Sequence, residues 1–225
     1  MLRGDFHMHT HFSPDCATPP EALVRRCHEV GLTCIAVTDH NSIAGARAVQ
    51  AIAPFTVILG EEVKSTEGEI TGLFLQEEVP RGLSPLETAK RIKEQGALVS
   101  IPHPFARTGR SSLGRGPLLE LLPYVDLMEA FNARTTSAKT TESGRAFAEE
   151  HGILKTAVSD AHTLRELGRT YTELPDFDGT PEGFKQAIAE ATLVEHPAGK
   201  FVHLYSSLNR IRRKFSGPRL PDGSA

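Results

Sequence analysis

Short apolar runs alternate with amphipathic patterns along most of the chain, which predicts strands and helices in turn. The runs that predict strands lie at residues 2–7, 34–38, 55–59, 70–75, 97–101, 125–131, 154–158 and 169–174. The patterns that predict helices lie at residues 19–30, 42–53, 84–95, 140–151, 180–190 and 206–214. Strands that alternate with helices are typical of an α/β fold with a parallel sheet, either open or closed into a barrel.

Polar and glycine residues mark where several of these elements begin and end. Ser42, Ser84 and Thr180 are each expected to cap the helix that follows. A turn through residues 66–68 would join the strands on either side of it as a hairpin. Glycine, serine and arginine crowd residues 107–116, which predicts a loop.

Length, charge and cysteine content narrow the class of protein. The 225 residues fit one barrel domain over residues 1–215 and a flexible tail at 216–225. A net charge of -3 gives no electrostatic reason to expect duplex nucleic acid as a partner. Three cysteines without metal-site spacing favour a reducing cytoplasm over a disulfide framework. No apolar run has the length of a membrane span and the chain begins with polar residues, so we expect neither a membrane segment nor a secretory one.

Potential metal ligands follow the ends of most of the predicted strands. In chain order these are His7 and His9, Asp39 and His40, Glu62, His103, Asn132, and Asp160 with His162. In a parallel barrel all strand C-termini lie on one face, so these side chains would converge there. Residues two apart on an extended segment also point to the same side, as His7 and His9 would. Each histidine alone is better explained as a hydrogen-bonded core or surface residue, but the repetition at strand ends argues against that explanation for the set.

Imidazole and carboxylate ligands together suit Zn, Mn and Fe. A carboxylate such as that of Glu62 can bridge two cations, and cations about 3.5 to 4 Å apart can activate water and hold a phosphoryl oxygen. The sequence therefore predicts two or three divalent cations (Mn, Fe or Zn) as cofactors.

The strand-end motifs resemble those of the PHP (polymerase and histidinol phosphatase) family. The segments that carry the resemblance are Asp5-Phe6-His7-Met8-His9-Thr10, Thr38-Asp39-His40-Asn41, Gly60-Glu61-Glu62, Pro102-His103-Pro104 and Ser159-Asp160-Ala161-His162. The resemblance spans about residues 3 to 175 and implies a distorted (β/α)7 barrel with a metal site at the C-terminal ends of the strands. It also implies metal-dependent phosphoesterase activity.

The resemblance further implies three metal positions. The first would be held by His7, His9, Glu62 and Asp160, the second by Glu62 and His103, and the third by Asp15, His40 and His162. Two departures weaken the second position. Asn132 stands where several members have a histidine, and the segment 69–72 lacks the histidine that some members carry on the strand after the bridging glutamate.

Other residues are candidates for supporting roles. We expect Asp5 and Asp39 to accept imidazole N–H groups, with helix capping an equal alternative for Asp39. Asn132 would be a weak ligand or a supporting residue. Glu61 would point away from Glu62 as an exposed charge, and His11 would be a solvated loop residue.

The candidate catalytic residues are Asp160, His162, Arg107 and Arg110. Guanidinium groups bind phosphate oxygens in bidentate fashion, so Arg107, Arg110 or Arg115 could clamp the substrate, against the alternative of a solvated loop. Arg134 and Lys139 are weaker candidates for the same role. The basic helix at 206–214 is interpreted as a solvated face.

The function indicated is hydrolysis of a small phosphomonoester or a nucleotide phosphodiester by metal-activated water, with a small phosphorylated molecule or short nucleotide as the partner. Amide or ester hydrolysis at the same metals is the first alternative. A non-catalytic metal-binding module is the second. The oligomeric state is left open by the sequence.

Overall fold

The computed structural model describes residues 1–106 and 111–199, and its strands form one nine-stranded sheet. The strands are β1 (Leu2–Asp5), β2 (Cys34–Val37), β3 (Thr56–Lys64), β4 (Glu69–Leu73), β5 (Leu98–Ile101), β6 (Val125–Asn132), β7 (Leu154–Val158), β8 (Tyr171–Leu174) and β9 (Thr192–Val194). Their order in the sheet is β7-β6-β5-β4-β3-β2-β1-β8-β9. Most strands therefore pair with their neighbours in the sequence, as short connections favour.

The sheet is mixed, which corrects the expectation of a parallel one. Strands β1, β2 and β3 run parallel, as do β5, β6 and β7. Strand β4 is antiparallel to both β3 and β5, and β8 is antiparallel to β1 and β9. The reversal at β4 arises because only residues 65–68 separate it from β3, and a connection this short can make a hairpin but not a crossover.

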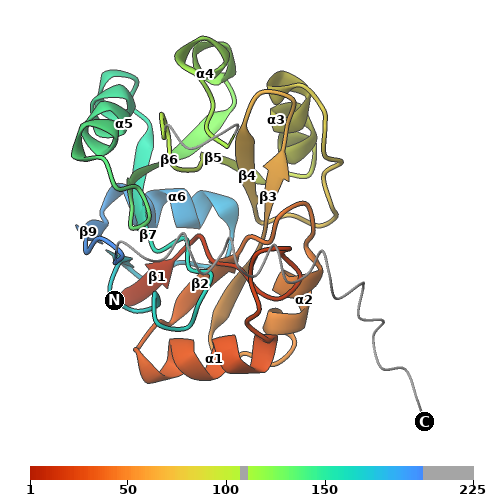
Figure 1. The fold of residues 1–225 in the computed structure, drawn as a ribbon, viewed down its shortest axis with the longest axis vertical. Helices are drawn as coiled ribbons and strands as arrows, with labels where there is room; N and C mark the ends of the chain where they lie inside the picture. Colours follow the sequence, from red (N-terminus) through yellow and green to blue (C-terminus); the bar gives the residue numbers. More distant parts are fainter. Residues whose placement is uncertain (107–110, 200–225) are drawn as a thin grey trace.

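The sheet curls into a nearly closed barrel, which confirms the distorted barrel fold (Figure 1). Near the start of β1, strand β8 fills the space between β1 and β7: Thr172 Oγ1 donates to Ala157 O and accepts from Ala157 N, both at 3.0 Å. Beyond the strand ends the two segments meet directly, because Met8 and Ala161 form a parallel bridge and His9 N donates to Ala161 O at 2.9 Å. The barrel thus closes most tightly at its C-terminal rim.

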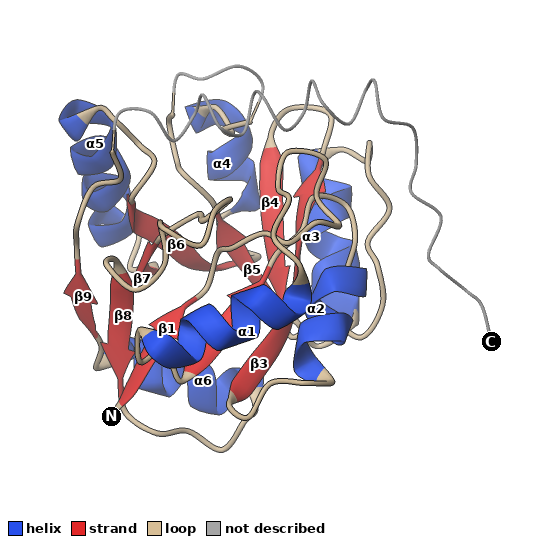
Figure 2. Cartoon of the chain, turned by 60° about the horizontal axis from the view of Figure 1, so that its bottom comes forward, coloured by secondary structure: helices blue, strands red, loops and turns tan. Residues whose placement is uncertain are grey.

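Helices surround the barrel, with α1 and α2 on one side in Figure 1 and α3, α4 and α5 on the other. The helices are α1 (Pro20–Glu29), α2 (Ala44–Gln50), α3 (Pro85–Glu94), α4 (Arg115–Leu121), α5 (Ala138–Glu150) and α6 (Pro181–Ala189). Helix α6 lies across the end of the barrel where β1 begins (Figure 2). Its Phe184 and Ile188 pack there with apolar residues that include Phe6, which follows β1, and Leu174 of β8.

The helix starts were predicted well where a hydroxyl caps the first turn. Ser84 Oγ accepts from Glu87 N, and Thr180 Oγ1 accepts from Gly183 N. The cap expected at Ser42 is wrong, because α2 begins two residues later with Ile43 at the capping position, and Ser42 Oγ instead accepts from Ala44 N. The loop expected over residues 107–116 is also partly wrong, because α4 begins within it at Arg115.

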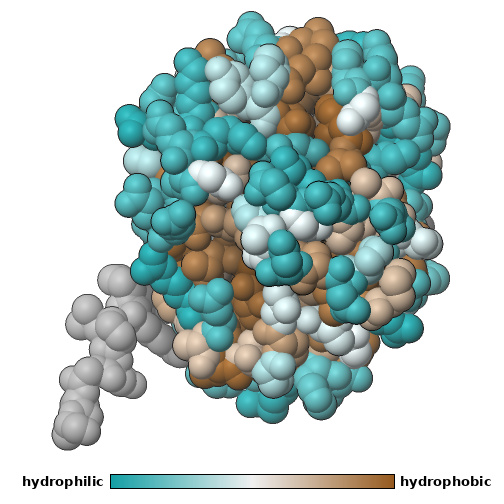
Figure 3. Space-filling view, turned by 180° about the vertical axis from the view of Figure 1, so that it is seen from behind, coloured by the Kyte–Doolittle hydropathy of each residue, from teal (hydrophilic) through white to brown (hydrophobic). Residues whose placement is uncertain are grey.

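Side chains of the three apolar clusters fill the barrel interior and the layers between sheet and helices. Few large apolar residues are exposed among those described; they are Met1, Phe12, Ile52 and Leu119. Figure 3 shows one face, on which hydrophobic patches lie among hydrophilic side chains. No helix of the described chain is both long and apolar enough to cross a membrane. The helix expected at 206–214 and the tail at 216–225 lie outside the described residues, and the single domain over 1–215 stays a prediction.

Candidate metal centre

Five histidines from separate parts of the sequence converge at the C-terminal rim of the barrel. The ring centroid of His9 lies 4.2 Å from that of His162 and 4.6 Å from that of His40. His7 lies 5.0 Å from His9 and 5.9 Å from His103. The end of β1 brings in the first pair, and the segments after β2, β5 and β7 bring in the others.

Glu62 occupies the middle of this cluster. Its Oε1 lies 2.9 Å from His103 Nε2, and its Oε2 lies 2.9 Å from His40 Nδ1 and 3.4 Å from His7 Nε2. The residue is 1% exposed. Because the two oxygens face different histidines, one carboxylate can serve two cations.

Asp160 and Asp15 supply carboxylates on the other side of the cluster. Asp160 Oδ1 lies 3.4 Å from His9 Nε2 and 3.7 Å from His7 Nε2. Asp15 lies 3.5 Å from the Nε2 atoms of both His40 and His162. Three groups of side chains could each hold an ion; they are His9 with His40 and His162, His7 with His9 and Glu62, and His40 with Glu62 and Glu69.

Two of these side chains stand on backbone in the left-handed region. His103 has φ of 30° and Asp160 has φ of 52°. Non-glycine residues rarely adopt such angles, and the strain persists only where the surroundings impose it. Both residues come directly after a buried strand, so the chain turns sharply to aim them into the cluster.

Glu129 holds two of the cluster's histidines in place through hydrogen bonds, a role that the sequence did not reveal. Its Oε1 lies 2.6 Å from His7 Nδ1, and its Oε2 accepts from His103 N at 2.6 Å and from Asn132 Nδ2 at 2.8 Å. A carboxylate bound to Nδ1 keeps the proton there and leaves Nε2 with its lone pair for a cation. Glu129 lies on β6 three residues before Asn132, and this closeness to a candidate ligand at a strand end is the sequence signal that could have found it.

Asp39 supports His9 through a hydroxyl relay. Asp39 Oδ1 accepts from Thr10 N at 2.7 Å and from Ser13 Oγ at 2.6 Å. Ser13 Oγ in turn lies 3.0 Å from His9 Nδ1. These contacts favour the supporting interpretation of Asp39 over the helix-capping one. Ser13 is a further residue whose part in the site the sequence did not reveal.

Asp5 and Asn132 also contact the frame of the cluster, and the contact of Asp5 differs from the one expected. Asp5 Oδ1 accepts from the backbone N–H of Ser159 at 3.0 Å, so it holds the backbone that precedes Asp160 rather than an imidazole. Asn132 Nδ2 donates to Asp160 Oδ2 at 3.2 Å, and its Oδ1 accepts from Arg134 N at 2.9 Å. Asn132 is thereby placed as a supporting residue.

The electrostatic surroundings fit divalent cations. Burial lowers the pKa of His9 to about 3, and the imidazoles of His162 and His40 act in the same direction, so His9 presents a neutral nitrogen. Burial opposes the ionisation of Glu62, yet the neighbouring His7 and His40 hold its pKa well below the usual range. Burial opposes the protonation of His7, His40 and His103, but neighbouring carboxylates, chiefly Glu129 for His7 and Glu62 for the other two, raise their pKa values above the usual range, that of His103 to about 9. A cation that binds here would displace these imidazole protons and take their place beside the ionised carboxylates.

Glu61 is not the exposed charge that strand alternation suggested. It is 0% exposed, and its Oε2 accepts from Val79 N at 2.8 Å. Burial raises the pKa of Glu61 to about 7. The prediction was wrong because the segment that carries Val79 folds over this face of β3, a long-range contact that the local pattern does not contain.

The candidate phosphate-binding residues lie in different places. Arg107 and Arg110 lie outside the described residues. Arg134 is 6% exposed and its Nη1 lies 3.1 Å from Glu166 Oε1, so it contributes to the frame of the site, and its substrate role stays a prediction. Glu166 also accepts from His162 N at 3.1 Å, a link that the sequence did not reveal.

The remaining cationic and aromatic candidates lie toward the periphery. Arg115 pairs with Glu150 at 3.4 Å and lies over the Phe147 ring. Lys139 is exposed. His11 stacks on the ring of Phe12 at 4.7 Å between centroids.

An α/β barrel with histidines and carboxylates gathered at one rim places the protein in the class of barrel proteins with a candidate multinuclear metal centre. The PHP domain model matches residues 5–99 and the PHP-associated model matches residues 142–193. The uncharacterized protein MJ0417 of Methanocaldococcus jannaschii is 32% identical over 180 residues, which cover 79% of this chain and 72% of that protein. The chain belongs to the PHP family.

Solved structures share the fold at low sequence identity. A two-domain protein of Bacteroides vulgatus containing a predicted PHP-like metal-dependent phosphoesterase superposes with a TM-score of 0.67 at 18% identity, covering 93% of this chain and 69% of that one. An amidohydrolase of Chromobacterium violaceum, solved with sulfate and no metal, superposes with a TM-score of 0.61 at 15% identity, covering 85% and 98%.

Proposed function

We propose that this protein is a metal-dependent phosphoesterase that hydrolyses a small phosphomonoester or a nucleotide phosphodiester. The observation that carries the proposal is the position of Glu62, whose two carboxylate oxygens face histidines from separate strands at the centre of a buried cluster. Membership of the PHP family and the phosphoesterase description of the Bacteroides vulgatus neighbour support this chemistry.

The ligand assignment that we propose divides the cluster into three positions. His7, His9, Glu62 and Asp160 would hold the first cation, Glu62 and His103 the second, and Asp15, His40 and His162 the third. We propose two or three cations in total, with Mn, Fe or Zn as the candidates. When bound, divalent cations supply the Lewis acidity that polarises a phosphoryl oxygen and lowers the pKa of water.

The chain's own residues would orient this chemistry. Glu129 holds the Nδ1 proton of His7, and the Asp39–Ser13 relay holds that of His9, so both Nε2 atoms point into the cluster. The side chains of His7 and His9 are 0% exposed, whereas those of His40, Asp160 and His103 are 17%, 12% and 11% exposed. The substrate would therefore approach from the side of these three residues.

The candidate catalytic residues fit that direction of approach. The side chains of Asp160 and His162 are 12% and 7% exposed, and His162 Nδ1 lies 2.9 Å from Asp160 O, which leaves Nε2 facing Asp15. Arg107 and Arg110 follow His103 by only four and seven residues, so we propose them as the phosphate clamp.

Amide or ester hydrolysis at the same centre is the second candidate, favoured by the amidohydrolase that shares the fold. A non-catalytic module is disfavoured on physical grounds. Glu62, Asp160 and Asp15 are buried against shared histidines, and even paired charges cost more to bury than apolar side chains of similar size, so such a cluster is a costly arrangement for a module without a function.

A substrate panel tests the proposal. Metal-free protein is reloaded with Mn²⁺, Zn²⁺ or Fe²⁺ and assayed on an aryl phosphate, a bis-aryl phosphate and an aryl ester. We expect hydrolysis of at least one phosphate, no turnover in the metal-free protein, and loss of turnover in Glu62→Gln but not in Glu67→Gln, which changes an exposed residue of the β3–β4 hairpin. Esterase activity without phosphatase activity would reject the proposal in favour of the second candidate.

A further inference from the structure

We propose that Glu69 is a direct metal ligand and completes the second cation position with Glu62 and His103. The inference rests on the metal centre of the proposed function and deepens it. This position is the one that the sequence left weakest, since neither Asn132 nor segment 69–72 supplies a histidine. The carboxylate of Glu69, on β4, would serve as the ligand that a histidine would otherwise provide at this position.

The register of the β3–β4 hairpin places Glu69 beside Glu62. Glu62 pairs with Thr71, and Lys64 pairs with Glu69, so the side chains of all four lie on one face of the two strands. Glu62 and Glu69 are diagonal neighbours on that face, within reach of a shared ion.

The contacts of Glu69 lead into the cluster. Its Oε2 lies 3.7 Å from His103 Nε2, the atom that also contacts Glu62 Oε1 at 2.9 Å. One ligand atom each of His40, Glu62 and Glu69 lies within 4.8 Å of the others. The side chain of Glu69 is only 12% exposed, so water does little to relieve the repulsion between two neighbouring carboxylates.

Thr71, the hairpin partner of Glu62, and His103, whose Nε2 lies near Glu69, each carry a buried polar atom that supports a polar ligand nearby. Within residues 1–106 and 111–199, His103 Nδ1 and Thr71 Oγ1 are buried without a hydrogen-bond partner. Such atoms are rare in native proteins and call for an explanation. A hydrated cation bound between Glu62, Glu69 and His103 would bring water molecules to this part of the site.

Lys64 is the competing explanation for the position of Glu69. Its Nζ lies 3.6 Å from Glu69 Oε1, the oxygen that faces away from His103. The lysine side chain is 35% exposed, so the pair is screened by solvent and accounts poorly for a carboxylate held against Glu62. Because the two oxygens of Glu69 have different neighbours, Lys64 can orient the carboxylate without preventing cation binding.

The ligand set predicts which cation the position prefers. Two carboxylates and one imidazole are richer in oxygen than the His9, His40 and His162 group on the other side of the centre. Oxygen ligands suit Mn²⁺ and Mg²⁺, whereas imidazole suits Zn²⁺. The second position should therefore select Mn²⁺ over Zn²⁺.

The inference can be tested without an activity assay, by preparing the full chain free of metal and counting the ions that it then takes up. Equilibrium dialysis against Mn²⁺, with metal analysis by mass spectrometry, is applied to wild type, Glu69→Gln, Glu69→Ala and Glu69→His, with Glu67→Gln as the matched control. We expect Glu69→Ala to bind one Mn²⁺ fewer than wild type, or to bind the weakest ion at least about tenfold less tightly. Glu69→His should retain that ion and shift its preference toward Zn²⁺.

Two results would overturn the inference. One is an unchanged ion count and affinity in both Glu69→Gln and Glu69→Ala. The other is loss of the same ion in Lys64→Met with Glu69 intact, which would make the lysine pair the relevant feature. Circular dichroism of each metal-free variant shows that it is folded, and the isosteric Glu69→Gln serves if Glu69→Ala does not fold.

The outcome is separable from that of the proposed function. If wild type binds ions and loses one on substitution of Glu69, the ligand assignment stands even if no phosphate ester is hydrolysed. If wild type binds no ions at the centre, both proposals fail together.

Discussion

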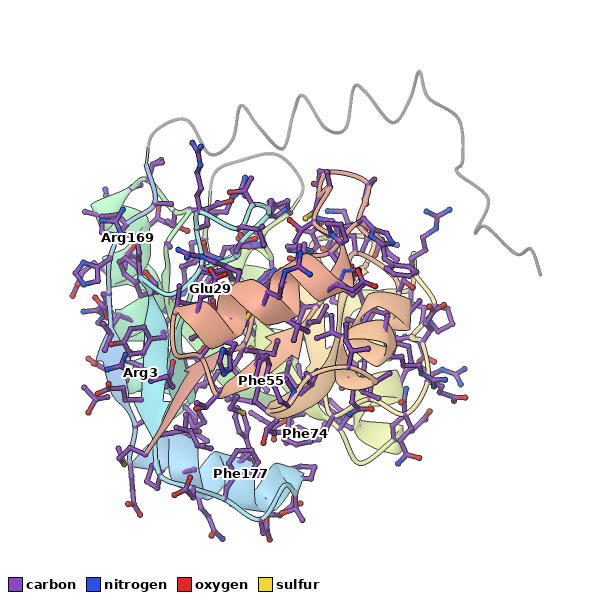
Figure 4. The ribbon with its side chains drawn as sticks, turned by 90° about the horizontal axis from the view of Figure 1, so that it is seen from below. Arg3, Glu29, Phe55, Phe74, Arg169 and Phe177 are labelled. Carbon is purple, nitrogen blue, oxygen red and sulfur yellow. The ribbon has the colours of Figure 1, made fainter. Side chains whose placement is uncertain are left out.

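The two ends of the barrel are built from the same strands but from opposite kinds of side chain. At the C-terminal rim, imidazoles and carboxylates are buried against one another around Glu62. At the other end, Phe184 of α6 packs edge-on against Phe6, Phe74 and Phe177, with ring centroids 4.9 to 5.4 Å apart. Figure 4 labels two of these rings, Phe74 and Phe177, beside α6. Strand β1 leads into Phe6 and His7 in succession, and so serves both ends.

The contrast separates what holds the fold from what performs chemistry. The aromatic end removes apolar surface from water, which stabilises the folded state. The rim keeps charged groups dehydrated and two residues in strained backbone, which costs stability unless cations bind. Substitutions at the aromatic end should therefore lower stability and leave ion binding intact, whereas substitutions at the rim should act mainly on ion binding and on the smaller electrostatic part of the stability.

The largest effect is expected for Glu62→Gln, which removes the carboxylate shared between two positions. Phosphoesterase activity should fall to the background of the metal-free protein. Saturating Mn²⁺ should stabilise wild type by about 2.7 kcal/mol per site at a hundredfold excess over Kd, and the variant by less. Thermal unfolding with and without Mn²⁺ measures this, and an equal Mn²⁺-induced shift in both proteins would contradict it.

Phe184→Ala should have the next largest effect, on stability alone. Phe184 is 0% exposed, and its truncation should lower the free energy of unfolding by about 3 to 5 kcal/mol. Chemical denaturation measures the loss, with Ile52→Ala as a control at an exposed apolar position. Ions bound per folded chain and turnover per folded chain should stay at the wild-type level; a fall in either would mean that the two ends are coupled.

Glu129→Gln should weaken the rim without removing a ligand. The amide keeps the size of the side chain but loses the charge that fixes His7 Nδ1 and His103 N. Metal affinity or turnover should fall by about 10 to 100-fold, as for other residues that orient a metal ligand. Mn²⁺ titration measures the affinity. The exposed Glu142→Gln is the control, and wild-type affinity in Glu129→Gln would argue that His7 is held by other contacts.

Asp5→Asn should produce the smallest effect, a change in the pH dependence of stability. Burial raises the pKa of Asp5 from 3.8 to about 7, so the folded protein binds this proton more tightly than the unfolded chain. The stabilisation is then complete below the unfolded value and is lost as pH rises toward 7. In chelator-treated protein, the melting temperature of Asp5→Asn should gain on that of wild type between pH 4 and pH 7; parallel curves would contradict the assignment.

The sequence predicted the elements and the rim because both depend on local patterns. The apolar runs place all the strands from β1 to β8, and the motifs ending in His9, His40 and Asp160 stand at strand ends, where barrel topology brings them together. The short β9 was not predicted, because three residues give too little pattern to identify a strand. Helix α4 was hidden by the glycine and arginine content around its first turn.

The parts of the site that escaped prediction depend on contacts between distant segments. Glu129 meets His7 across 122 residues of chain, and Glu166 meets Arg134 across 32. Glu61 was misassigned because the chain folds back over it, and Glu69 enters the cluster only through the hairpin register. None of these contacts leaves a periodic trace in the sequence.

A crystal structure of the protein loaded with Mn²⁺ and phosphate, with anomalous data at the manganese edge, tests the central claim most directly. We expect anomalous peaks on both sides of Glu62, one shared with His7 and Asp160 and another with His103, and phosphate in contact with them. Peaks located elsewhere, or none at this rim after saturation with Mn²⁺, would contradict the account.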